Sequence, residues 1–211
     1  MKKLIVEFIG TFFLVLTIGM AVITPGAGSL APIAIGSVLM AMVYAGGHIS
    51  GAHYNPAVTL AIALRGKVKM AEAISYMVVQ VAAAVVASFV VMYLKGVHMA
   101  GVSASPMPGV ASVLAEFLFT FALCWVVLNA ATAKGTAGNS FYGLAIGFIV
   151  LAGAFAVGSI SGGAFNPAVA VGVTTMGLST FGNIWKFLLG EFTAAIAAAV
   201  IFKFVNSEET T

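Results

Sequence analysis

Charge is what this sequence has least of. Only 7% of its 211 residues are charged, no residue is an aspartate, and one is a cysteine. Soluble domains carry about 25% charged residues, so a chain with 62% hydrophobic residues cannot cover a water-exposed surface. The composition therefore predicts an integral membrane protein. The single cysteine, Cys124, cannot form an internal disulfide, and its apolar surroundings in the sequence indicate a buried, inert thiol.

The hydrophobic residues fall into six runs, each long enough to cross a bilayer of about 30 Å as a helix. These runs are residues 4–23, 31–49, 71–94, 111–133, 141–158 and 182–204. The first run begins like a signal peptide, but it reaches about 20 residues and contains Glu7, so we interpret it as a retained helix.

Two further apolar segments, 55–64 and 166–176, are only about ten residues long. At 1.5 Å per residue, each crosses about half of the membrane. Both begin with a proline one residue into the helix, where the missing N–H has no helical partner to lose. We therefore expect two re-entrant half-helices.

The two halves of the chain repeat each other. VEFIGTF at residues 6–12 resembles AEFLFTF at 115–121, and NPAV occurs at 55 and again at 166. Each half contains three spans, an odd number, so the second half enters the membrane from the opposite side. The sequence thus predicts one all-α transmembrane domain, residues 1–211, built from inverted repeats at about 1–95 and 111–204.

Basic residues are unevenly divided between the two sides of the predicted membrane. With the N-terminus inside, seven of the nine are cytoplasmic, and only Lys95 and Lys186 lie outside. The cytoplasmic set is Lys2, Lys3, Arg65, Lys67, Lys69, Lys134 and Lys203. This bias sets the orientation, with both termini cytoplasmic. It also explains the net charge of +3 without a nucleic-acid partner.

Inversion directs the N-termini of both half-helices towards the membrane centre. Two partial positive dipole ends then meet there, beside the side-chain amides of Asn55 and Asn166. The preceding runs, 47–54 and 158–165, are rich in glycine and serine and would supply carbonyl acceptors. Non-helical backbone at this depth is tolerated where it is packed in protein or lines a water-filled cavity. The pattern predicts a narrow path for small neutral solutes that opposes cations.

Taken together, these motifs resemble the aquaporin, or major intrinsic protein, family. The resemblance rests on two Asn-Pro-Ala motifs, on their contexts GGHISGAHYNPAVT and SGGAFNPAV, and on Glu7 and Glu116 in the first helix of each half. It implies an aquaporin-like fold and a homotetramer in lipid, with one pore per subunit and no cofactor or metal. The implied central pore residues are Asn55, Pro56, Ala57, Asn166, Pro167 and Ala168.

By the same resemblance, the outer selectivity filter falls at Ile35, Ala154, Gly163 and Val169. The family normally has an arginine where Val169 stands, a histidine at Ala154 and a phenylalanine at Ile35. We therefore expect a wide, uncharged and apolar filter that admits glycerol, urea, ammonia, hydrogen peroxide or metalloid acids as well as water. A slip of one residue in the fifth helix would bring Phe155 to the filter instead of Ala154.

Three glutamates are expected within the membrane. Glu7 and Glu116 hold the same repeat position, and we expect each to accept hydrogen bonds from the backbone of a re-entrant loop. Glu191 stands 111 residues after Gln80, so these two are also repeat-related. A buried polar contact and pore lining both remain open for Glu191. Many relatives carry proline there.

Two histidines precede the first Asn-Pro-Ala motif. By resemblance His53 lines the cytoplasmic vestibule, and His48 is expected to tie down the loop. Their spacing of five places them in a predicted non-helical stretch without Cys or Asp nearby, so we expect no metal site.

The leading function is a passive transmembrane channel for water and small uncharged solutes. A secondary transporter is the alternative, because inverted repeats with broken helices also build transporters, although Glu191 is the one candidate for ion coupling. A structural membrane protein with a vestigial pore is a further alternative. No nucleophile–base pair stands out, so an enzyme is not expected. The compact loops suggest a prokaryotic plasma membrane.

Overall fold

A computed structural model describes residues 1–98 and 107–209, and within these ranges it contains helices but no strand. The α-helices are α1 (Lys2–Val22), α2 (Ala31–Ser50), α3 (Pro56–Leu64), α4 (Met70–Lys95), α5 (Gly109–Val127), α6 (Tyr142–Ser161), α7 (Pro167–Thr175) and α8 (Ile184–Val205). A π-helical turn, Leu128–Thr132, continues α5.

Six of these helices are long and apolar enough to cross a membrane. They coincide with the six predicted runs to within a few residues. The other two, α3 and α7, have nine residues each, which corresponds to about 14 Å of helix. The prediction of six spanning helices and two half-helices is therefore confirmed. One predicted boundary is wrong, because α6 continues to Ser161 instead of ending at 158.

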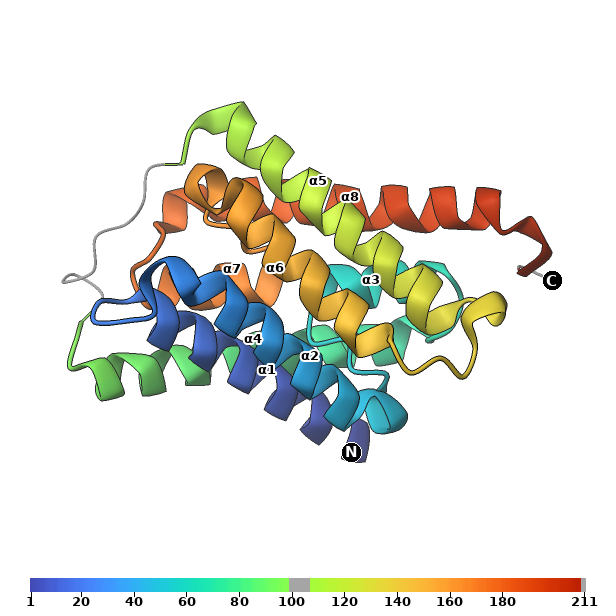
Figure 1. The fold of residues 1–211 in the computed structure, drawn as a ribbon, viewed down its shortest axis with the longest axis horizontal. Coiled ribbons are helices and arrows are strands. Elements are labelled where there is room, and N and C mark those ends of the chain that lie inside the picture. The colour runs from blue at the N-terminus through green and yellow to red at the C-terminus, as the bar shows by residue number, and fades with distance from the viewer. Residues whose placement is uncertain (99–106, 210–211) are drawn as a thin grey trace.

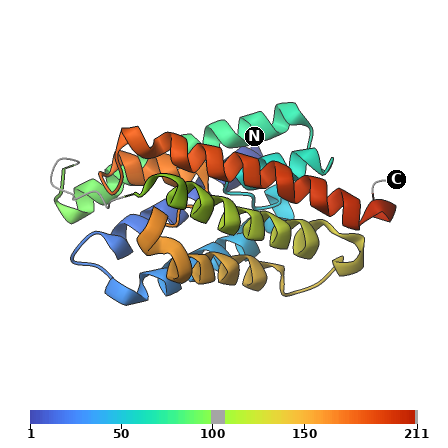
Figure 2. The same ribbon diagram turned by 90° about the horizontal axis from the view of Figure 1, so that it is seen from above.

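The long helices run along the long axis of the molecule, and α3 and α7 lie between them near its middle (Figures 1 and 2). Within each half, the first and last long helices pack together: α1 on α4, and α5 on α8. Each half-helix packs more extensively against the last helix of the other half, α3 on α8 and α7 on α4. The two halves are thus interlocked through the half-helices.

Helices α2 and α6 approach each other closely enough for backbone contact. A Cβ added to Gly147 would lie 2.6 Å from the carbonyl oxygen of Gly36, and one added to Gly36 would lie 2.8 Å from that of Gly147. Small residues permit such close packing of membrane helices. The contact closes the wall of the bundle on the side where the two halves meet.

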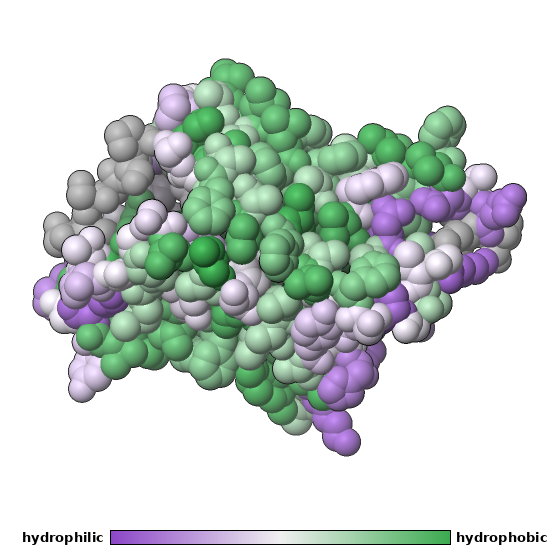
Figure 3. Space-filling view, viewed as in Figure 1, coloured by the Kyte–Doolittle hydropathy of each residue, from purple (hydrophilic) through white to green (hydrophobic). Residues whose placement is uncertain are grey.

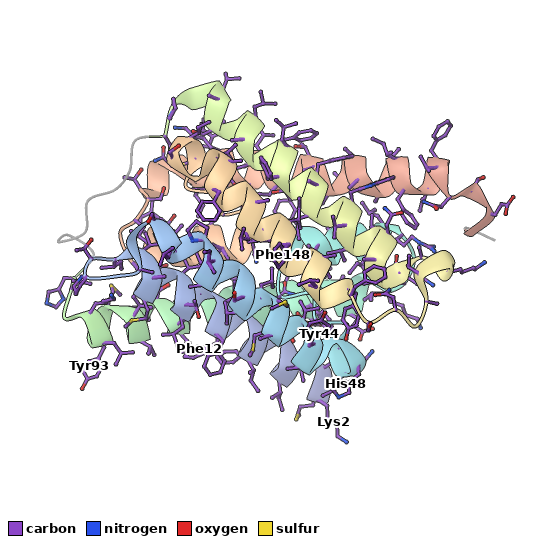
Figure 4. All side chains as sticks on the ribbon, in the orientation of Figure 1. Lys2, Phe12, Tyr44, His48, Tyr93 and Phe148 are labelled. Carbon is purple, nitrogen blue, oxygen red and sulfur yellow. The ribbon has the colours of Figure 1, made fainter. Side chains whose placement is uncertain are left out.

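The surface has an apolar belt between two more polar ends (Figure 3). Figure 4 shows Lys2 and His48 at the end that holds the N-terminus and Tyr93 at the opposite end, while Phe148 projects from the side of the belt. Phe202, near the end of α8, lies beside Arg65, and Lys3, near the start of α1, lines the same cavity as Lys67, so α1 begins and α8 ends on the same side of the molecule. An even number of membrane crossings requires this arrangement.

Candidate functional site

The chain enters both half-helices through the same local structure. Helix α2 ends at Ser50, and Gly51 follows with a left-handed φ of 89°. Asn55 then caps α3, because its side-chain oxygen accepts hydrogen bonds from the backbone of Ala57 at 2.8 Å and of Val58 at 3.3 Å. Such capping satisfies helix donors that have no partner within the helix. It anchors the start of the half-helix deep inside the protein.

The second half repeats this geometry. Gly162 ends α6 with a φ of 92°, and Asn166 caps α7 by accepting from the backbone of Ala168 at 2.9 Å and of Val169 at 3.4 Å. In both halves a proline occupies the first helical position, where its fixed φ favours the helix. Two short helices therefore begin with identical chemistry.

The carbonyl path before each cap is shorter than predicted. We expected acceptors from 47–54 and from 158–165, but the first four residues of each run lie in α2 and α6. Their carbonyls are used within helices; for example, the Gly47 oxygen accepts from the Gly51 nitrogen at 3.0 Å. Only 51–54 and 162–165 are non-helical. The prediction of free carbonyl acceptors is wrong for 47–50 and 158–161, because α2 and α6 continue to Ser50 and Ser161, directly before Gly51 and Gly162.

The two half-helices are joined by a reciprocal pair of hydrogen bonds. The Asn55 amide donates to the carbonyl oxygen of Phe165 at 2.8 Å, and the Asn166 amide donates to that of Tyr54 at 2.9 Å. Tyr54 and Phe165 both adopt left-handed backbone, with φ of 50° and 49°, a conformation that costs about 1–3 kcal/mol in residues with a side chain. Each asparagine amide retains a second N–H that can donate to a solute.

A buried carboxyl group supports the first loop. One oxygen of Glu7 accepts from the Ser50 hydroxyl at 2.6 Å and from the backbone nitrogen of His53 at 3.0 Å. The other accepts from the Tyr54 nitrogen at 2.7 Å and the Gln80 side-chain amide at 2.8 Å. Four donors onto one carboxyl group compensate for its complete burial.

The equivalent carboxyl group supports the second loop. Glu116 accepts from the backbone nitrogens of Ala164 at 3.1 Å and Phe165 at 2.7 Å. Glu191, on α8, accepts from the backbone nitrogen of Asn166 at 2.8 Å and is fully buried. Glu191 is not among the residues that line the central cavity, so of the two roles left open by the sequence, the structure gives it the buried polar contact.

A central cavity of about 70 Å³ passes between the half-helix N-termini. One water molecule requires about 10–15 Å³, so the cavity has room for only a short file of waters. Among the described residues that line it, His53, Tyr54, Asn55 and Asn166 have polar side chains, and the others are apolar or glycine. Hydrogen-bonding groups therefore occur at a few points along an apolar wall.

Cavities of larger volume adjoin the central one at both ends. One of about 590 Å³ lies at the end that holds Lys3 and Lys67, and it shares His53 with the central cavity. The other, of about 220 Å³, is lined by Met107 and Phe187 and also shares residues with the central cavity. The three cavities share lining residues in series, with the smallest cavity in the middle, and this series is called the path below.

The four residues predicted for the selectivity filter all line the central cavity. Ile35 and Ala154 lie where this cavity meets the 220 Å³ cavity. Phe155 is 53% exposed and is absent from the lining of both, so the register of α6 directs Ala154, and not its neighbour, to the path. The selective role of the four residues stays a prediction.

The two histidines occupy different environments. His53 is buried and lies with its Nδ1 3.2 Å from the Thr59 hydroxyl. His48 is exposed in the last turn of α2 at the rim of the 590 Å³ cavity, so its expected non-helical setting is wrong. Within the described parts of the chain, no three His, Cys, Asp or Glu side chains gather as a metal site.

Sequence reasoning missed the packing of Tyr54. Its hydroxyl donates to the carbonyl of Met42 at 2.9 Å, and a Cβ added to Gly10 or Gly46 would lie 2.1 or 1.9 Å from the tyrosine side chain. The two glycines create the space that this ring needs. The sequence shows a glycine on each of the first two helices, but only the structure shows that both glycines contact the Tyr54 ring.

Comparisons with known proteins agree over nearly the whole chain. The family described as "Major intrinsic protein" matches residues 1–202. The chain is 37% identical to "Aquaporin NIP1-4" of Oryza sativa subsp. japonica, covering 98% of this chain and 77% of that protein. It is 34% identical to "Glycerol uptake facilitator protein-like 6" of Lactiplantibacillus plantarum, covering 99% and 100%.

A solved structure gives the same fold. The X-ray structure of the aquaglyceroporin from Plasmodium falciparum superimposes with a TM-score of 0.80 at 18% sequence identity, covering 99% of this chain and 98% of the other. At this identity the likeness concerns the fold alone.

Proposed function

This chain belongs to the major intrinsic protein family and is a passive channel for water and small solutes, and we propose that Asn55 and Asn166 form the narrow centre of its pore. It is a multi-pass membrane protein and not an enzyme. One observation carries the proposal: the two amides meet inside a 70 Å³ apolar cavity and hold each other through the carbonyls of Phe165 and Tyr54.

In this proposal the two asparagines orient solutes as they pass. One N–H of each amide is used in the cross-link, and the second is available to a solute oxygen. A water molecule that accepts from both amides turns its own hydrogens away from the centre. This interrupts a hydrogen-bonded chain of waters, so protons do not cross along it. The apolar side chains on the rest of the wall offer no hydrogen bond to the solute.

Ions are excluded by the same centre. The N-termini of α3 and α7 carry partial positive charge, which repels cations. The described residues that line the central cavity include no Asp, Glu, Lys or Arg. Transfer of an ion from water into such a site is opposed by a large desolvation penalty. Neutral solutes therefore pass more easily than ions.

The proposed filter at Ile35, Ala154, Gly163 and Val169 favours solutes larger or less polar than water. None of these side chains is charged, and Val169 stands where the family normally has arginine. Glycerol, urea, ammonia, hydrogen peroxide and uncharged metalloid acids are the candidate solutes. Similarity to a protein named as a glycerol uptake facilitator supports the inclusion of glycerol.

The proposed setting is a prokaryotic plasma membrane, with both termini in the cytoplasm and four copies of the chain assembled in lipid. The common side of the start of α1 and the end of α8 supports the topology, and the surplus of basic residues there supports the orientation. The inverted repeat of about 1–95 and 111–204 is supported by the matching contacts of the two halves, such as α1 on α4 and α5 on α8.

The test is stopped-flow light scattering of proteoliposomes that contain the purified protein. Osmotic responses to water, glycerol, urea and ammonia are measured in parallel, with protein-free liposomes as the control. We expect faster water flux and at least one faster solute flux, linear with concentration and independent of proton or sodium gradients. Flux that saturates or follows an ion gradient would support a transporter, and flux equal to that of bare liposomes would support a vestigial pore.

A further inference from the structure

A buried side chain beside the re-entrant loop is an amide in the first half and a carboxyl group in the second. In the first half, the Gln80 amide donates to Glu7 at 2.8 Å and lies 3.1 Å from the Thr59 hydroxyl. The repeat-related position in the second half is Glu191, which also lies beside the loop carboxyl, Glu116. An amide donor in one half is thus replaced by a second carboxyl group in the other.

The two carboxyl groups hold three successive backbone amides. Glu116 accepts from Ala164 and Phe165, and Glu191 accepts from Asn166 through Oε1 at 2.8 Å. The contact with Asn166 reaches the residue that caps α7 and joins the half-helices. Glu191 therefore contacts the backbone of a central residue, Asn166, without lining the cavity itself.

The other oxygen of Glu191, Oε2, is fully buried and has no hydrogen-bond donor within reach among the described residues. A buried carboxylate oxygen without a donor is strongly unfavourable. The same oxygen carrying a proton becomes a donor itself, and the Glu116 carboxyl group lies beside the Glu191 side chain. One added proton therefore gives the buried Oε2 of Glu191 the hydrogen bond that it otherwise lacks.

The surroundings of the pair do not supply a compensating cation. From α5, the titratable groups that face Glu191 are Glu116 and Cys124. Helices α3 and α7, which also pack on α8, contain no titratable side chain. Arg65 follows α3 and lies over the ring of Phe202, which is eleven residues, or about 16 Å, along α8 from Glu191. Two adjacent buried carboxylates without a cation do not both ionise.

We propose that Glu191 is a positioning residue that keeps a proton on Oε2 and donates it to Glu116 in a hydrogen bond. It thereby provides for the second loop the donor that Gln80 provides for the first. Each half then has one ionised carboxylate held by neutral donors. The effect on flux rests on the proposed pore role of Asn166, whereas the proton itself does not.

The pair is sensitive to alkaline pH. The hydrogen bond between the carboxyl groups exists while the proton is bound, and it is lost when rising pH removes that proton. Thermal stability and water flux should therefore fall on the alkaline side. In Glu191→Gln an amide replaces the acid, so the donor to Glu116 persists and the alkaline loss disappears.

Infrared spectroscopy of the purified full chain in lipid at neutral pH reads the proton directly. We expect a carbonyl band of a protonated carboxylic acid that shifts in D₂O, is lost in Glu191→Gln and is retained in Glu72→Gln. Glu72 is a suitable control because it forms a surface ion pair with Lys3. A wild-type spectrum without an acid band overturns the proposal, and this measurement does not depend on any variant folding.

The pH profile gives the second test. Melting temperature and water flux are measured from neutral to alkaline pH for wild type, Glu191→Gln and Glu72→Gln. We expect Glu72→Gln to follow the wild type and Glu191→Gln to lose less melting temperature and less flux than the wild type as pH rises. Equal alkaline losses in all three proteins overturn the proposal. An acid band in a wild-type protein without flux would instead count against the channel.

Discussion

The side-chain nitrogen of Asn55 lies 2.8 Å from the carbonyl oxygen of Phe165, a residue 110 positions later in the chain. The matching bond from Asn166 to Tyr54 is 2.9 Å long. Each asparagine therefore caps its own half-helix with its oxygen and holds the other half of the molecule with its nitrogen. Asparagine at positions 55 and 166 therefore determines both where each half-helix begins and how the two halves of the chain are held together.

Replacing either asparagine by alanine should destabilise the fold. Asn55→Ala and Asn166→Ala each remove a cap and leave a buried carbonyl without its donor, so we expect each to lower the free energy of unfolding by about 1–3 kcal/mol. Denaturation followed by tryptophan fluorescence measures this. Because the two bonds belong to one joint, the double variant should lose less than the sum of the singles. Strict additivity would contradict a shared joint, and Asn206→Ala near the C-terminus is the control.

An arginine at Val169 should narrow the path for larger solutes. Val169 lines the central cavity and is almost fully buried, so a guanidinium there adds both bulk and charge. We expect urea and glycerol flux to fall about tenfold or more, equivalent to a barrier higher by about 1.4 kcal/mol, with a smaller effect on water. Val169→Thr, which has similar volume and no charge, is the matched control in proteoliposomes. Unchanged urea and glycerol flux in Val169→Arg would refute the filter assignment.

Substitutions at two neighbouring residues of α6 should differ in their effect on flux. Ala154 lines the path, whereas Phe155 is 53% exposed on the outside. Ala154→Leu adds three carbon atoms to the proposed filter and should reduce glycerol flux more than water flux. Phe155→Ala should leave both fluxes at the wild-type value. A larger flux change in Phe155→Ala than in Ala154→Leu would show that the register of the filter is different.

A methyl group at Gly46 should disrupt the support of the first loop. Its Cβ would lie 1.9 Å from the Tyr54 hydroxyl oxygen, and overpacking of this kind costs about 1–3 kcal/mol. Gly46→Ala should therefore lower both the melting temperature and the water flux. The matched control is Gly109→Ala at the start of α5, where an added Cβ meets no atom within 4 Å. A melting temperature for Gly46→Ala equal to that of the control would contradict the contact.

Much of the fold could be predicted from local features of the sequence. The length of each apolar run distinguishes spanning helices from half-helices, and an asparagine followed by proline marks the start of α3 and of α7. The places where prediction failed are also local. Ser50 and residues 159–161 extend α2 and α6 beyond the predicted runs, because the serines there are held by the packed bundle despite their weak preference for helix.

Contacts between distant residues could not be predicted. The repeat shows that Gln80 and Glu191 occupy equivalent positions. The contact of Glu191 with Asn166, in contrast, depends on how α8 packs beside the second loop. Likewise, the two glycines beside Tyr54 stand on different helices. That both glycines make room for the same ring is seen only once the two helices are packed together.

The sequence by itself determined the membrane location, the number and length of the helices, the repeat and the positions of the two caps. These follow from hydrophobic length and from hydrogen bonds within a few residues. The tertiary structure alone decided that Ala154 and not Phe155 faces the path, and that Asn55 and Asn166 hold each other's halves. A step of one residue turns a helix by about 100°, so the direction of a side chain is set by the packing of the whole helix against its neighbours.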